Sequence, residues 1–83
     1  MSSEFERQVN EASYEALMIK QPGAIAAIKG LLDAGETVDN IYWAGYHMSG
    51  GGPFIAGVFA NAAQHIIDGG VEEDENEISK NVG

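Results

Sequence analysis

Two histidines, His47 and His65, are the side chains of this sequence best suited to bind a metal ion or to transfer a proton near neutral pH. They lie eighteen residues apart and would meet if the helices that carry them run antiparallel, with Asp39 or Asp68 as a further ligand. A zinc site needs a third ligand at a diagnostic spacing, and the chain has no cysteine to supply one. The pattern therefore predicts no metal site and no catalytic residues. A ligand-binding or metal-binding enzyme subunit that uses both histidines and the glycine loop remains an alternative.

A run of glycines at residues 49–53, Ser-Gly-Gly-Gly-Pro, resembles in outline a loop that offers backbone N–H groups to an anion at the start of a helix. It lacks the Lys-Ser or Lys-Thr pair of a phosphate-binding loop and the spacing of a dinucleotide-binding one, and Pro53 has no N–H to donate. Ser49 also lacks the preceding glycine of a hydrolase nucleophile. We therefore interpret the run as a hinge between two helices and expect no cofactor.

Four neighbouring side chains with rings, Tyr42, Trp43, Tyr46 and His47, form the most distinctive cluster of the sequence. Aromatic residues that carry a polar group are enriched at protein–protein contacts, so the cluster predicts a docking face. The alternative is that Trp43 and the tyrosines complete the core of a small protein.

The elements that must position these residues are predicted to be helices. Residues 3–20 begin with Ser3 and Glu6, the reciprocal pair of a capping box. A second helix fits residues 23–34 with Gly35 as its stop, a third fits residues 38–48 with Thr37 as its cap, and a fourth begins at Pro53 and reaches Ile67.

The first predicted helix carries one apolar stripe at steps of four and three residues. Its members are Phe5, Val9, Ala12, Ala16 and Ile19. Such spacing is typical of a helix that packs one face onto another surface, so we expect the stripe to lie against something.

The fourth predicted helix is the most apolar segment. A strip of small side chains, Ala56, Ala60 and Ala63, would let another helix approach closely, and Phe54 and Phe59 flank it. Either this is the central helix of the fold or part of it is covered by another chain.

The charge of the chain restricts its partners. The 83 residues include 13 acidic and 4 basic side chains, for a net charge of −9, and residues 71–83 form an acidic tail. Because four basic side chains cannot neutralise several phosphates, we expect no binding to nucleic acid or to a membrane surface. The tail is expected to be disordered and to contact a basic partner, and a saline environment would also explain the acidity.

The start of the chain is acidic and lacks the basic region and apolar run of a secretory signal, which predicts a soluble intracellular protein. Helices of this size with so many alanines and glycines bury little apolar surface of their own. Small chains often bury the remaining apolar surface by oligomerisation, so we expect self-association or a larger complex.

The sequence thus predicts an all-α fold: a small bundle of about four short helices in a single domain of residues 1–70, followed by the tail. The predicted function is a non-enzymatic interaction module, a small structural subunit of a homo-oligomer or of a larger cellular or virion assembly. The alternative in the same class is a monomeric regulatory adaptor that binds one target protein. The predicted contact residues are Tyr42, Trp43, Tyr46, His47, Phe54, Ala56, Phe59, Ala60 and Ala63.

Overall fold

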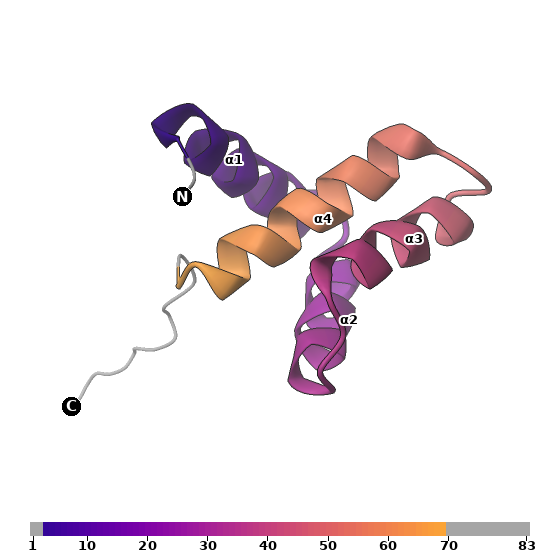
Figure 1. Cartoon of the computed structure of the whole chain (residues 1–83). Helices are drawn as coiled ribbons and strands as arrows, with labels where there is room; N and C mark the ends of the chain where they lie inside the picture. The colour runs from indigo at the N-terminus through magenta and orange to yellow at the C-terminus, as the bar shows by residue number, and fades with distance from the viewer. Residues whose placement is uncertain (1–2, 70–83) are drawn as a thin grey trace.

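The computed structural model describes residues 3–69 and shows an all-α fold over that range (Figure 1). Its helices are α1 (Glu4–Lys20), α2 (Pro22–Asp33), α3 (Val38–Met48) and α4 (Pro53–Ile67). The predicted small helical bundle is therefore confirmed. The acidic tail predicted for residues 71–83, and with it the boundary of the domain at residue 70, lies outside the described residues.

The ends of the helices follow from local hydrogen bonds that the sequence anticipates. Ser3 and Glu6 form the predicted capping box, with the Glu6 N–H donating to Ser3 Oγ at 3.0 Å. Thr37 Oγ1 accepts from the Asn40 N–H at 3.1 Å and begins α3. Gly35 ends α2 with a φ of 93°, a left-handed conformation that favours glycine.

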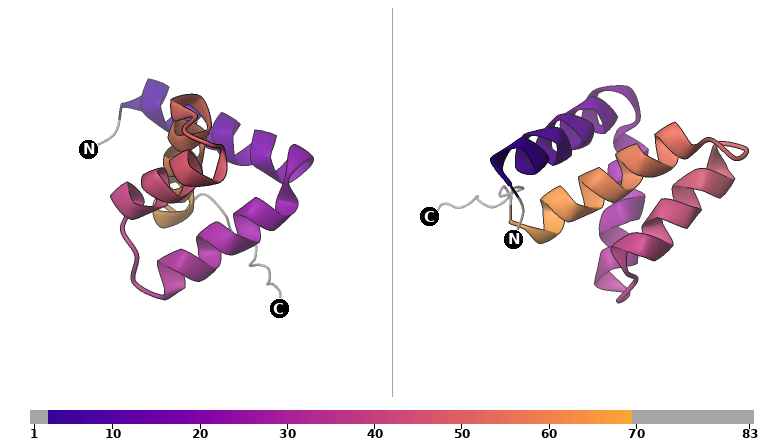
Figure 2. Two further views of the ribbon diagram at one scale, coloured as in Figure 1. Left: turned by 90° about the vertical axis from the view of Figure 1, so that its right-hand side faces the viewer. Right: turned by 45° about the horizontal axis from the view of Figure 1, so that its top comes forward.

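Helix α4 is the centre of the fold. It contacts α1, α2 and α3, and α1 and α3 pack on different sides of it (Figures 1 and 2). The chain reverses direction between α3 and α4, so these two helices form an antiparallel pair. Helix α2 runs across the α3–α4 pair and packs mainly against α1 and α4.

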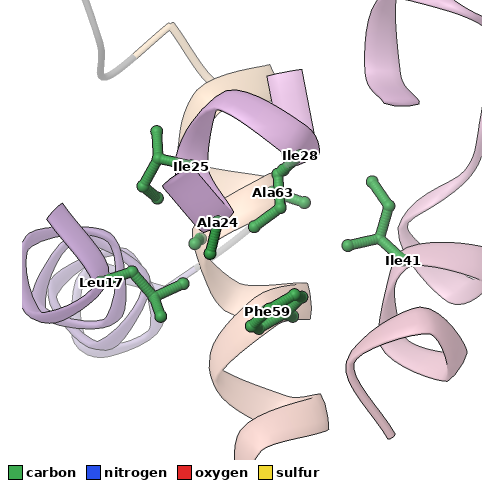
Figure 3. Close-up of a cluster of buried hydrophobic side chains, with 8 residues drawn as sticks. Leu17, Ala24, Ile25, Ile28, Ile41, Phe59 and Ala63 are labelled. Atoms are coloured by element: carbon green, nitrogen blue, oxygen red, sulfur yellow. The ribbon is translucent and has the colours of Figure 1, made fainter. Parts of the chain in front are cut away.

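The core lies between α2, α3 and α4, and α1 adds Leu17 to it (Figure 3), with Tyr14 packed against the cluster. Ile28 and Ile41 are fully buried there, beside Phe59 of α4. The helices α3 and α4 approach so closely that a methyl group at Gly45 would lie 2.9 Å from Cγ of Phe59. Glycine at this position is therefore required by the packing rather than by the conformation of the backbone.

No described part of the chain buries the apolar stripe of α1, so its expected contact stays a prediction. Phe5 is 73% exposed and Ile19 is 81% exposed, and the other members of the stripe are also exposed. Helix α1 instead turns Asn10 and Leu17 inward, on a face roughly a third of a turn away.

The reason lies on the facing surface of α4, which carries polar side chains. Asn61 Nδ2 donates to Ser13 Oγ at 3.4 Å, and the His65 ring packs against the Tyr14 ring with centroids 5.0 Å apart. Ser13 and Tyr14 of α1 are matched to these two groups, and the apolar stripe is left on the outside.

Candidate interaction surfaces

The predicted aromatic cluster lies together on one side of α3. The Trp43 ring is 5.1 Å from the Tyr42 ring and 5.3 Å from the Tyr46 ring, centroid to centroid, and 6.5 Å from the His47 ring. Trp43 is 47% exposed and His47 is exposed, while both tyrosines are half-buried. Trp43 therefore does not complete the core, and the cluster presents a continuous aromatic surface that can contact another molecule.

The predicted contact residues of α4 divide into two groups. Ala56, Phe59 and Ala63 are buried against the other helices of the same chain, so they are core residues and not a contact surface. This corrects the prediction: the small side chains do admit close helices, but those helices belong to this chain. Phe54 is 78% exposed, and Ala60 is half-buried at the edge of a groove.

The two histidines lie at opposite ends of the hairpin formed by α3 and α4. In an antiparallel pair, residues equally distant from the turn are neighbours, and His47 is close to the turn while His65 is near the far end of α4. Twelve residues separate His65 from Pro53 at the start of α4, which corresponds to about 18 Å of helix.

Each histidine instead belongs to a different part of the surface. His47 is in the aromatic cluster, and His65 lines a polar hollow of about 280 Å³ between α1 and α4. The described residues contain no group of three or more histidine, aspartate and glutamate side chains that could hold a metal ion. The alternative that joins both histidines in one site has no support from this geometry.

The glycine loop uses its N–H groups for its own closure. The Gly50 and Gly51 N–H groups donate to the carbonyl oxygens of His47 and Tyr46, and the Gly52 N–H donates to Ser49 Oγ at 2.9 Å. Gly50 and Gly51 have φ values of 72° and 94°, which explains why they are glycines. The loop reverses the chain as predicted, and its donors are not directed at a ligand.

The exposed stripe of α1 is a further apolar surface, which the predicted contact residues do not include. Helical spacing identifies an apolar face, but it does not show whether the rest of the chain has anything to cover it. Next to the stripe lies a groove of about 370 Å³ between α1, α4 and the start of α3. Its lining residues are Phe5, Glu6, Val9, Asn10, Val38, Ala60, Asn61 and Gln64.

Asn10 is a buried polar side chain on the inner face of α1, with 7% of its surface exposed. It borders both the groove and the polar hollow. Helix α1 therefore turns both a polar and an apolar side chain, Asn10 and Leu17, toward the chain, and its exposed surface carries the apolar stripe among charged residues.

Comparison of the chain with protein-family models, with curated proteins and with solved structures found no match. Over residues 3–69, none of the helices combines the length and the hydropathy that crossing a bilayer requires.

Proposed function

We propose that this chain is a non-enzymatic helical interaction module that works as a small structural subunit of a homo-oligomer or larger assembly. The observation that carries the proposal is the exposure of the whole apolar stripe of α1. A monomer of this size rarely exposes a row of apolar side chains that includes large ones such as Phe5 and Ile19 unless they contact another molecule. The stripe, rather than the alanine strip of α4, is thus the principal contact surface.

The size of the stripe is consistent with reversible association. Complete burial of a phenylalanine, isoleucine or valine side chain contributes roughly 1.5–3 kcal/mol. Three such side chains from each of two copies would contribute on the order of 10 kcal/mol. Loss of translational and rotational freedom costs on the order of 4–15 kcal/mol, so association should depend on concentration.

The aromatic cluster of α3 offers a second contact surface. It lies on a helix that packs on a different side of α4 from α1, so a subunit held through α1 still presents Trp43. Trp43 is well suited to bind a second protein because it combines a large apolar ring with an N–H donor. The second candidate function is the regulatory adaptor. In that case the aromatic cluster of α3 alone would bind the target protein.

The lack of enzymatic activity is part of the proposal and is supported by the placement of the reactive side chains. His47 and His65 lie at opposite ends of the α3–α4 hairpin, and Ser49 Oγ is engaged by the backbone of its own loop. The acidic tail is proposed to contact a basic partner, and nucleic acid and membranes are not proposed as partners, because the chain has only 4 basic side chains.

Two phenylalanines make a matched test of the proposal. Phe5 and Phe54 are each the second residue of a helix and are 73% and 78% exposed. Because both are exposed, Phe5→Ser and Phe54→Ser should leave the folded monomer nearly as stable as the unmodified chain. Sedimentation velocity over a wide range of concentrations should show oligomers for the unmodified chain and for Phe54→Ser, and mainly monomers for Phe5→Ser.

An unmodified chain that remains a folded monomer at every concentration would contradict the assembly proposal and favour the adaptor. Loss of the oligomer in Phe54→Ser but not in Phe5→Ser would move the contact from α1 to the turn between α3 and α4.

A further inference from the structure

The stripe of α1 has nearly the same pattern when it is read in either direction. Ala12 is at its centre, and the large residues Phe5 and Ile19 each lie seven residues from it. Val9 and Ala16 lie three and four residues from the centre, one on each side. A surface with this symmetry can pack against a copy of itself around a twofold axis, as isologous dimer interfaces do.

We infer that two copies of this chain pair through α1 in an antiparallel arrangement, with the twofold axis near Ala12. This inference rests on the proposed function. The small side chains at the centre let the two helix axes approach to about 8–10 Å. Phe5 of each copy then lies across from Ile19 of the second copy. Both residues are free to make this contact because no described part of their own chain covers them.

The charges of α1 favour this direction over a parallel one. Glu4 and Glu6 are in the first turn and Lys20 is in the last. An antiparallel pair places Lys20 of each copy beside Glu6 of the second copy, since both residues flank the stripe on the same side of the helix. A parallel pair places the two acidic first turns together and aligns the two helix dipoles, both of which are unfavourable.

The position of α1 in the fold leaves room for the second copy. Helix α1 packs against α4 and α2 with its inner face, and the stripe is directed away from that contact. The groove beside Phe5 and Val9 extends this surface toward Ala60 with a lining of mixed apolar and polar residues, and the edge of a second helix can lie there. The stripe is therefore accessible to a second copy in the folded monomer.

Cross-linking through introduced cysteines tests the direction of pairing, because the natural chain contains no cysteine. Gln8 and Glu15 are exposed, border the stripe on its other side, and lie nearly equally far from Ala12. Mild oxidation of an equal mixture of Gln8→Cys and Glu15→Cys chains should give the mixed disulfide as the main product. Met18→Cys chains, with the cysteine on the opposite side of α1, are the control and should remain largely uncross-linked.

The outcomes separate this inference from the proposed function. Equal or greater yields of the two symmetric disulfides would overturn the antiparallel arrangement while leaving self-association intact. A dimer by sedimentation that forms none of these disulfides would overturn pairing through α1. A monomer by sedimentation would overturn the proposed function itself.

Two charge-removing variants provide an independent measurement. Glu6→Gln keeps the capping box, because a glutamine side chain can also accept the hydrogen bond from the Ser3 N–H. It removes the two Glu6–Lys20 ion pairs of the antiparallel dimer. The dissociation constant should rise by roughly two- to thirtyfold at low salt. Glu15→Gln, the matched control, should change it little, because Glu15 would face Lys20 only in a parallel pair. The opposite ranking of the two variants would contradict the inference.

Discussion

Helices α1 and α4 are the two longest helices of the described chain, and both carry apolar residues at helical spacing. They differ in where those residues lie. Ala56, Phe59 and Ala63 of α4 are buried inside the chain, whereas Phe5 and Ile19 of α1 face solvent. The buried apolar residues of α4 belong to the core, whereas the apolar stripe of α1 belongs to the surface.

The comparison indicates that an apolar helix face is buried within the chain only where other helices of the fold can pack against it. Helix α4 is covered on several sides by α1, α2 and α3, and its alanines allow all three to approach. Helix α1 lies at the edge of the fold and turns Ser13, Tyr14 and Leu17 inward. Ser13 and Tyr14 meet Asn61 and His65 of α4. The apolar side of α1 is then available to another copy.

The largest expected effect comes from placing a charge on each of the two helices. Ala63→Glu would bury a carboxylate with no partner in the core and should lower the free energy of unfolding by roughly 3–5 kcal/mol. Ala12→Glu, on the exposed stripe, should change the stability of the monomer by less than about 0.5 kcal/mol. Urea unfolding followed by circular dichroism at low protein concentration would measure both. Similar losses in the two variants would show that the stripe is buried within the monomer.

A smaller effect, with opposite signs, is expected at two glycines within the α3–α4 pair. Gly45→Ala brings a methyl group against Phe59 and should destabilise the fold by roughly 1–3 kcal/mol. Gly57→Ala meets nothing within 4 Å and should stabilise it by about 0.5–1 kcal/mol through helix propensity. Thermal or chemical unfolding would compare the two. A stabilising Gly45→Ala would contradict the close contact between α3 and α4.

Much of the fold could be predicted because its signals are local. The capping box of Ser3 and Glu6, the cap at Thr37 and the left-handed stop at Gly35 depend on residues within one turn of the helix end. The direction in which α1 faces could not be predicted, since it depends on which side chains α4 presents forty or more residues later.

The candidate site was predictable only in part, for a similar reason. Trp43 and His47 lie four residues apart on one helix, so their proximity follows from helix geometry alone. The alternative in which His47 and His65 meet is not supported by the register of the two helices. An antiparallel hairpin with its turn near residue 50 pairs His47 with the first residues of α4. Counting from the turn would have excluded that site.

The central claim is that a second copy of the chain covers the α1 stripe in solution. The chain has three phenylalanines, of which Phe5 and Phe54 are exposed and Phe59 is buried. Fluorine NMR of protein labelled with fluorophenylalanine reports on each of them separately as the sample is diluted. The Phe5 resonance should move with concentration while the Phe54 and Phe59 resonances stay fixed. A Phe5 resonance that stays at its solvent-exposed position even in concentrated samples would contradict the claim.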